Sequence, residues 1–237
     1  MNYLLDNLTL IIPTKNDHLR VQENLRENID FLKKNIKNFE VLIISNGSTL
    51  DSLAFIDDLI KTYRFIRHLK INSSGKGLAI KTGLINSKFN INLFMDADSS
   101  VRINEFKKFV KNNQLQSPFV IGNRKNSLSR NIGSPIIRKI TGDIYLKIIQ
   151  VMFKIGLEDT QCGFKAIDKS KFLTYKNLNV EGFSFDIELI LLARTENINI
   201  IEIPVTYTHN NDSKVNVYID TFKMLFDLIK IKKYSKF

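Results

Sequence analysis

The feature that most constrains the fold is an alternation of short apolar runs and amphipathic segments between residues 8 and 95. The apolar runs are short enough for strands and end at Pro, Gly, Ser or Asp. They are 8–12, 39–44 and 90–95, with a more polar run at 65–71. The segments between them, 17–35, 52–63 and 77–86, have helical periodicity. This order predicts an α/β fold with a doubly wound, mixed sheet flanked by helices.

The second half of the chain is less regular but continues the same pattern. A further strand is expected at 119–122, and another at 198–205, where Pro204 closes it. Helices are expected at 134–155 and 185–194, and a loop at 159–165. Because there are no internal repeats and no Gly/Ser linkers, the 237 residues are expected to form one domain.

Composition narrows the class of protein without naming an activity. The hydrophobic fraction of 43% is typical of a soluble globular chain, and no run of about 18 apolar residues predicts a membrane-spanning helix. No signal peptide is recognised, and the lone Cys162 excludes an internal disulfide, so a cytoplasmic location is expected. The net charge of +11 fits equally a compositional bias toward lysine that aids solubility and an affinity for polyanions, which include nucleic acid, phosphorylated substrates and anionic membranes.

The most specific motif is Asp96-Ala-Asp98, which directly follows the apolar run that ends at Met95. Ligands of doubly wound sheets bind at the carboxyl ends of the strands, where these two carboxylates are expected. Carboxylate oxygens suit Mg²⁺ or Mn²⁺, whose coordination shell substrate phosphates can complete. An isolated pair of this kind is more often a solvated turn, but its place after a strand favours a metal site.

A second motif, Gly75-Lys76-Gly77, begins a predicted helix. Its glycines let backbone amides approach an anion, and the helix N-terminus and Lys76 add positive charge. It is not a P-loop, because Gly77 follows the lysine where Ser or Thr is required. Taken alone, this motif is more often an ordinary loop at a helix start.

These motifs, taken in order, resemble those of family 2 glycosyltransferases, specifically the dolichyl-phosphate mannose and glucose synthases and their polyprenyl-phosphate relatives. The matching segments span most of the chain. They are Ile11–Asp17 (IIPTKND), Ile44–Ser48 (ISNGS), Gly75–Gly83 (GKGLAIKTG), Asp96–Asp98 (DAD), Ile121–Arg124 (IGNR), Asp159–Lys165 (DTQCGFK), Gly182–Glu188 (GFSFDIE) and Ser213–Val215 (SKV). The resemblance implies a GT-A-type domain over residues 1–216.

The resemblance also implies a donor site for a nucleotide sugar. Pro13, Asp17 and Asn46 would border the nucleoside, and Lys76 would approach the diphosphate. Asp96 and Asp98 would hold the Mg²⁺ or Mn²⁺ ion that bridges this diphosphate. Lys214 would belong to a loop that closes over the donor. His209, which lies just before that loop, is a further candidate for the metal, although an exposed loop histidine is the commoner case.

For the acceptor, the resemblance implies a basic phosphate site. Arg124, Arg138 and Lys139 would bind the acceptor phosphate, and Asp159 would lie near the reaction centre. The expected catalytic residues are therefore Asp98, Asp159 and Arg124. A phosphate acceptor is already ionised and needs no strong base, whereas an alcohol acceptor would need one, for which Asp159 is the candidate.

The sequence departs from the family at Ser45-Asn46, where relatives carry two carboxylates. Asn46 can hydrogen-bond a base edge but does not supply a carboxylate's charge. The departure leaves the nucleotide base open and raises the alternative of a relative that has lost catalysis.

The C-terminal residues 217–237 predict a basic amphipathic helix, with apolar residues at helical spacing and several lysines. Such a helix can lie on an anionic membrane surface, or its apolar side can pack on the domain. The family's larger members carry membrane helices, whereas here only peripheral contact, on the cytoplasmic membrane face, is expected.

The combined prediction is inverting transfer of a hexose, with UDP-glucose favoured as donor, to a polyprenyl or dolichyl phosphate. A glycosyltransferase that acts on a sugar hydroxyl, a sugar-nucleotide nucleotidyltransferase and a non-catalytic basic binding protein remain as alternatives. A nucleic-acid partner is not expected, because the lysines are spread along the chain and no docking motif is present. The sequence leaves the oligomeric state open.

Overall fold

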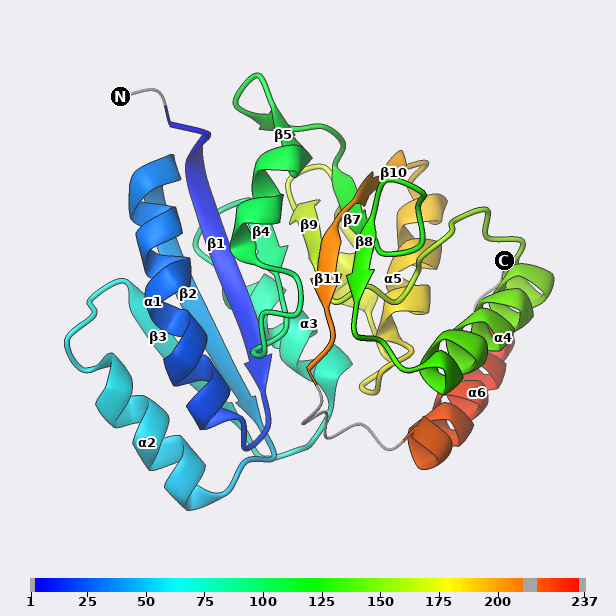
Figure 1. The fold of residues 1–237 in the computed structure, drawn as a ribbon, viewed down its shortest axis with the longest axis horizontal. Helices are drawn as coiled ribbons and strands as arrows, with labels where there is room; N and C mark the ends of the chain where they lie inside the picture. Colours follow the sequence, from blue (N-terminus) through cyan, green and yellow to red (C-terminus); the bar gives the residue numbers. More distant parts are fainter. Residues whose placement is uncertain (1–2, 211–216, 235–237) are drawn as a thin grey trace.

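The computed structural model describes residues 3–210 and 217–234 of the chain, and its centre is a mixed sheet (Figure 1). Within these residues the sheet has seven strands in the order β10-β7-β9-β4-β1-β2-β3. In chain order they are β1 (Leu5–Thr14), β2 (Ile36–Asn46), β3 (Ile66–Ile71), β4 (Ile91–Phe94), β7 (Phe119–Asn123), β9 (Lys165–Asp168) and β10 (Ile200–Pro204). The predicted doubly wound, mixed sheet is confirmed.

The first four of these strands form the parallel half of the sheet, in which β1 pairs with both β2 and β4, and β2 pairs with β3. The connecting helices are α1 (His18–Asn35), α2 (Leu50–Ile60) and α3 (Lys76–Asn86). Figure 1 shows α1 in front of the sheet and α3 behind it, so the sheet is covered on both faces. This burial explains why β1 and β2 appear as nearly continuous apolar runs.

The strand β9 was not predicted. The sequence analysis placed a loop at 159–165, which ends where the strand begins, and the strand itself has only four residues. It pairs antiparallel with β4 on one side and with β7 on the other. Its first residue, Lys165, is fully buried, which a hydrophobicity pattern does not predict. This insertion joins the parallel half of the sheet to the pair β7 and β10.

Smaller elements complete the second half. Two-stranded sheets form from β5 (Val110–Lys111) with β6 (Gln114–Leu115) and from β8 (Arg130–Ile132) with β11 (Thr206–Thr208). The 3₁₀ helices are η1 (Ile103–Phe109) and η2 (Thr174–Asn177). The remaining helices are α4 (Ile136–Phe153), α5 (Phe185–Thr195) and α6 (Val217–Tyr234).

The helices α4 and α6 lie side by side at one end of the molecule (Figure 1). The predicted C-terminal helix is present as α6, and its Leu228 and Ile231 are buried against the domain. The division of the chain at residue 216 stays a prediction. Among the described residues, no helix is both long and apolar enough to span a membrane.

The contact between α3 and β1 generates a prediction about stability. A Cβ atom added at Gly83 would lie 2.6 Å from Cγ2 of Ile11, which is fully buried. We expect Gly83→Ala to lower the free energy of unfolding by roughly 1–3 kcal/mol, because the helix must shift away from the sheet. Chemical denaturation measures this change.

The matched control is Gly142→Ala in the middle of α4, where an added Cβ meets nothing within 4 Å. Alanine is the better helix former, so this variant should be unchanged or more stable by up to about 1 kcal/mol. Equal stability of the two variants would contradict the close packing of α3 on β1.

Candidate functional site

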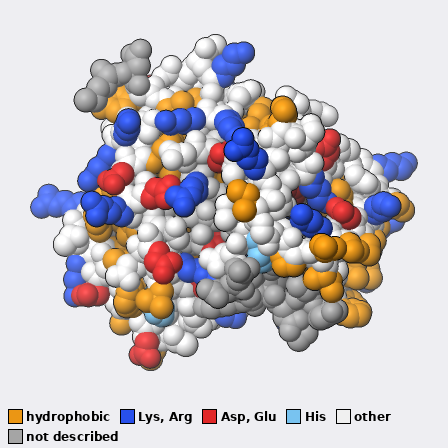
Figure 2. Space-filling model, viewed as in Figure 1, with side chains coloured by type: hydrophobic (Ala, Val, Ile, Leu, Met, Phe, Trp, Pro, Cys, Tyr) orange, Lys and Arg blue, Asp and Glu red, His pale blue; other side chains and the backbone are white. Residues whose placement is uncertain are grey.

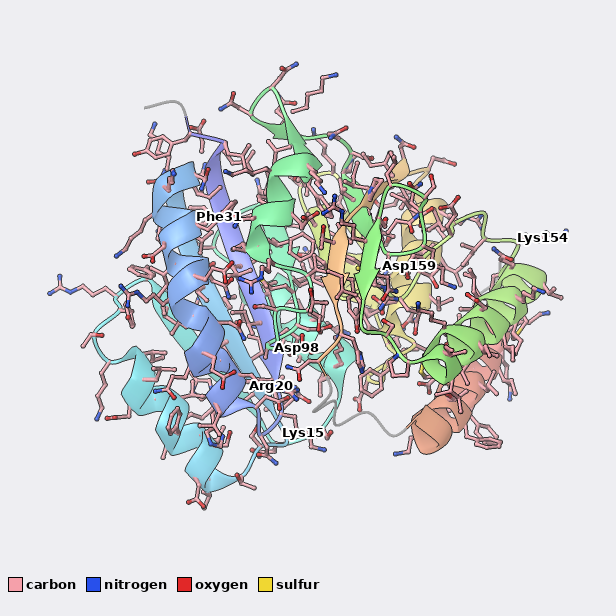
Figure 3. The ribbon with its side chains drawn as sticks, in the orientation of Figure 1. Lys15, Arg20, Phe31, Asp98, Lys154 and Asp159 are labelled. Carbon is pink, nitrogen blue, oxygen red and sulfur yellow. The ribbon has the colours of Figure 1, made fainter. Side chains whose placement is uncertain are left out.

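Polar residues from several strand ends gather around two neighbouring cavities. The first, of about 1570 Å³, lies beside the ends of β1, β2 and β4, and the second, of about 620 Å³, lies beside β7 and α4. Lys76, Asp96 and Asp98 line both cavities. In Figure 3, Asp98 lies near the carboxyl end of β1, and Asp159 lies farther toward α4.

The first cavity contains the residues that the sequence predicted for a nucleoside, namely Pro13, Asp17 and Asn46. The side-chain amide of Asn46 makes two hydrogen bonds to the backbone beside this cavity. Its Nδ2 donates to the Thr14 carbonyl at 3.0 Å, and its Oδ1 accepts from the Gly75 amide at 3.1 Å. A carboxylate could accept the second bond but could not donate the first. Asn46 therefore holds the β1 end and the Gly75 loop together.

Its neighbour Ser45 is fully buried and does not line either cavity. The Ser45 hydroxyl lies 2.7 Å from Nε2 of His68, whose Nδ1 lies 2.7 Å from an Asp57 oxygen. Burial lowers the pKa of His68, although Asp57 opposes this change. Ser45, one of the two positions at which the sequence departs from the expected family pattern, is thus part of an internal hydrogen-bond chain, which the sequence did not reveal.

The two carboxylates of the Asp96-Ala-Asp98 motif lie where the cavities meet. The Lys76 ammonium lies 2.5 Å from Oδ1 of Asp96, and Oδ1 of Asp98 accepts a hydrogen bond from the Ser100 amide at 3.0 Å. Burial alone would lower the pKa of Lys76, but the carboxylates of Asp96 and Asp186 outweigh it and raise this pKa. Lys76 is therefore a fixed positive charge beside the motif.

The Asp96 carboxylate packs against the backbone of Gly163. Asp96 occupies the room left by the absent side chain of Gly163, and a Cβ there would overlap its carboxylate. Across residues 3–210 and 217–234, no group of three or more His, Cys, Asp or Glu side chains is arranged to hold a metal. The oxygens of Asp96 and Asp98 are suitable ligands for Mg²⁺ or Mn²⁺, provided that a phosphate completes the shell.

The second cavity contains an ion pair between the partly exposed Arg124 and the buried Asp159. Nε and Nη2 of Arg124 donate to the two Asp159 oxygens at 2.7 and 2.8 Å, and the Arg124 backbone amide adds a third bond at 2.9 Å. The guanidinium carbon also lies 5.4 Å from the centre of the Tyr207 ring. This arrangement holds the guanidinium plane in one orientation.

The ion pair decides the charge state of both groups. Burial would raise the pKa of Asp159, but Arg124 outweighs it and keeps this pKa below its usual range. Burial would lower the pKa of Arg124, and the Asp159 carboxylate instead raises it. Both groups are therefore ionised at neutral pH. A carboxylate held in this way is a weak base.

Two supporting contacts were missed by the sequence analysis. The fully buried Lys165 donates to an Asp186 oxygen at 2.6 Å and to the Cys162 carbonyl at 2.5 Å. The Glu202 carboxylate accepts from the backbone amides of Glu158 and Asp159. Lys165 lies in the segment Asp159–Lys165, and Asp186 lies in the segment Gly182–Glu188. Each is a charged residue next to apolar ones, and this was the signal that could have indicated a buried ion pair.

The remaining predicted residues are dispersed. Lys139 is exposed and lines the second cavity. His209 lines neither cavity, and its Nδ1 lies 3.4 Å from the Tyr207 hydroxyl. The side chain of Arg138 and the whole of Lys214 lie outside the described part of the structure. The functional roles of all these residues stay predictions.

Fold and site together define a class of α/β enzyme in which paired carboxylates and a lysine lie at the carboxyl ends of parallel strands. A model of Glycosyl transferase family 2 matches residues 9–175, so the chain belongs to this family and is a glycosyltransferase. The family and the enzyme class predicted from the sequence are confirmed.

The more specific resemblance is confirmed by individual relatives. A dolichyl-phosphate beta-glucosyltransferase, ALG5D, of Trichomonas vaginalis is 31% identical over 97% of this chain and 74% of its own length. The dolichyl-phosphate beta-glucosyltransferases of Dictyostelium discoideum and Saccharomyces cerevisiae are each 28% identical, over 95% of this chain and 73% and 74% of their own lengths.

Solved structures agree on the fold. The glucosyl-3-phosphoglycerate synthase of Mycobacterium tuberculosis, in complex with Mn²⁺, UDP and phosphoglyceric acid, aligns with a TM-score of 0.70 over 98% of this chain and 80% of its own. The same enzyme has also been solved with Mg²⁺ and UDP, and aligns with a TM-score of 0.67. Sequence identity is only 14–15%, so this likeness concerns the GT-A fold alone.

The Gly163 contact generates a prediction about the metal site. We expect Gly163→Ala to rotate the Asp96 carboxylate out of its place. If Asp96 holds the metal, as the sequence predicts, this change should weaken Mn²⁺-dependent binding of UDP at least about tenfold. Isothermal titration calorimetry with and without chelator measures the effect.

Gly156→Ala is the matched control, because an added Cβ there meets nothing within 4 Å. It should bind UDP as the unmodified chain does. If Gly163→Ala retained full metal-dependent affinity, Asp96 would not be a ligand of the metal.

Proposed function

We propose that the enzyme transfers glucose, with inversion, from UDP-glucose to a dolichyl or other polyprenyl phosphate. The single observation that carries this proposal is the meeting of the two cavities at Lys76, Asp96 and Asp98, with Arg124 in the second cavity. A donor diphosphate and an anionic acceptor could then approach the same point from different sides. The names of the dolichyl-phosphate beta-glucosyltransferases support the same substrates.

On this proposal the first cavity holds the donor. The nucleoside lies between Pro13, Asp17 and Asn46, and the diphosphate lies beside Lys76. Asp96 and Asp98 would hold Mg²⁺ or Mn²⁺, which neutralises the charge that develops on the leaving diphosphate. Lys76 would add a second positive charge beside the diphosphate oxygens. Without donor, the Lys76 ammonium is paired with Asp96, so on donor binding it would move from that carboxylate to the diphosphate.

The second cavity receives the acceptor phosphate. Asp159 already occupies Nε and Nη2 of Arg124, and none of the hydrogen bonds between described residues uses its Nη1. Nη1 and the nearby Lys139 are therefore the groups proposed to bind the phosphate oxygens. The fixed guanidinium orients the acceptor for in-line attack on the anomeric carbon.

The charge of Asp159 favours a phosphate over a sugar hydroxyl as acceptor. A hydroxyl needs a base with a pKa near the working pH, whereas the pKa of Asp159 is lowered and both its oxygens bind Arg124. A phosphate monoester already carries the nucleophilic charge. Asp159 is thus proposed to position Arg124 at the reaction centre and not to accept a proton.

Donor binding tests the first half of this proposal. UDP with Mn²⁺ should raise the melting temperature of the chain more than GDP or CDP with Mn²⁺ does, and chelator should remove the shift, because the metal links the diphosphate to the carboxylates. Asp98→Asn should fold normally and lose the metal-dependent part of the shift. An undiminished shift in folded Asp98→Asn would contradict the metal assignment, and no shift with any nucleotide would contradict a donor site.

The acceptor half is tested by Arg124→Ala. We expect UDP affinity to change less than about threefold, while kcat/KM for a short-chain polyprenyl phosphate falls by two or more orders of magnitude, because a charge-assisted contact to the acceptor is lost. Since this change leaves Asp159 buried without its partner, Asp159→Asn with Arg124→Ala controls for loss of stability. An equal loss of donor and acceptor affinity would assign Arg124 to the donor cavity.

A further inference from the structure

The two groups of residues assigned to phosphates leave a region between them. On the proposed function, the donor diphosphate lies beside Lys76 and Asp96, which line both cavities, and the acceptor phosphate lies beside Arg124, which lines only the second. Figure 3 labels Asp98 near the first group and Asp159 beside the second. The transferred hexose is bonded first to the diphosphate and then to the acceptor, so it must occupy the region between them.

One short segment of the chain connects these two groups. It begins at Asp159, whose carboxylate binds Arg124, and it ends at Gly163, whose backbone packs against the Asp96 carboxylate. Thr160 and Gln161 lie between these ends, and both line the second cavity. Their place in the segment therefore puts them beside the region where the hexose must lie.

Both residues carry a polar atom that lacks a partner. Oγ1 of Thr160 and Nε2 of Gln161 are buried and make no hydrogen bond to any residue that the structure describes. Thr160 as a whole is only 1% exposed. Unpaired buried polar atoms are unfavourable and rare, so a partner from outside the chain is expected. Because both residues line the second cavity, a rotation of either side chain would turn its polar atom toward a ligand there.

We propose that Thr160 and Gln161 bind hydroxyl groups of the transferred hexose and so determine which nucleotide sugar is used. This rests on the proposed function, which fixes the two phosphates at either end. Sugar hydroxyls supply oxygens that accept hydrogen bonds from a threonine hydroxyl and from a glutamine amide. A site whose buried polar groups bind a substrate hydroxyl discriminates strongly against an analogue without it, because the groups are then left unpaired.

A phosphate group fits these two atoms less well than a hexose does. Phosphate oxygens bind most strongly to charged donors, which Lys76 supplies at the donor end and Arg124 and Lys139 supply at the acceptor end. Lys and Arg side chains are also spread over the face of the molecule shown in Figure 2, so positive charge by itself does not select the position of a neutral sugar. Uncharged hydrogen-bonding groups do, and Thr160 and Gln161 are such groups.

Two apolar side chains complete the lining of this region. Phe183 and Met224 line both cavities, and Phe183 is 37% exposed. A hexose presents C–H groups as well as hydroxyls, and apolar side chains can cover the former. Sites for small ligands commonly combine an apolar lining with a few well-placed polar groups. The composition of the region is therefore that expected for a sugar.

Calorimetry of donor binding, with Mn²⁺ and without acceptor, tests the proposal. The unmodified chain should bind at least one monodeoxy analogue of UDP-glucose roughly tenfold or more weakly than UDP-glucose itself. Thr160→Val keeps the shape of the side chain without its hydroxyl, and Gln161→Met keeps the length without the amide. Each variant should lose the preference for UDP-glucose over one of the analogues, while the affinity for UDP changes less than about threefold, because UDP lacks the sugar.

Thr82→Val is the matched control, because the Thr82 hydroxyl donates to the Leu78 carbonyl at 2.8 Å and the residue lines neither cavity. It should keep the preference. Without donor, Thr160→Val should unfold at the same temperature as the unmodified chain or at a higher one, since it removes an unpaired buried hydroxyl. A purely structural role of this hydroxyl would instead lower the melting temperature, without changing the preference among sugars.

Two results would overturn the proposal. One is an unchanged sugar preference in both Thr160→Val and Gln161→Met. The other is an unmodified chain that binds every monodeoxy analogue as tightly as UDP-glucose. A raised KM for a short-chain polyprenyl phosphate, with the sugar preference unchanged, would assign the two residues to the acceptor and would equally overturn it.

These outcomes are separable from those of the proposed function, because donor binding is measured without acceptor and transfer is measured separately. Absence of UDP binding contradicts the donor site and, with it, the assignment of Thr160 and Gln161. UDP binding with an unaltered sugar preference in the variants contradicts only this assignment. An altered preference without transfer to the polyprenyl phosphate contradicts only the proposed acceptor.

Discussion

The arrangement of the site depends on one buried ion pair, between Lys165 on β9 and Asp186 at the start of α5. A buried ammonium is strongly disfavoured unless it is paired and hydrogen-bonded, and Lys165 meets this requirement with Asp186 and the Cys162 carbonyl. The pair ties the antiparallel strand to the helix behind it. It also sets the course of the segment between Asp159 and Gly163, which carries the contacts of the second cavity.

From this segment the charge pattern of the site follows. Asp159 holds Arg124 in the second cavity, and Gly163 leaves room for Asp96 beside Lys76. Positive and negative groups thus alternate through the two cavities. Lys76 and Arg124 are each paired with a carboxylate of the protein, and an incoming phosphate could compete with that carboxylate for the cation.

Much of this could be predicted from the sequence because its signals are local. The strands β1, β2 and β4 contain short, mainly apolar runs, and the Asp96-Ala-Asp98 and Gly75-Lys76-Gly77 motifs lie at their predicted places next to a strand end and a helix start. The strand β9 was missed, because four residues that begin with a lysine carry no periodicity. The hydrogen bond of Ser45 to His68 was also missed, since the two residues are brought together only by the pairing of β2 with β3.

By itself, then, the sequence determined the fold class, the family and the chemical types of group at the strand ends, because strand length, helical spacing and ordered motifs are properties of neighbouring residues. Only the tertiary structure decided which charges pair with which. It joined Arg124 to Asp159 and Lys165 to Asp186, and it left one face of α4 and α6 exposed beside the Arg124 cavity. These outcomes depend on burial and on distances between segments far apart in the chain, which periodicity along the sequence does not contain.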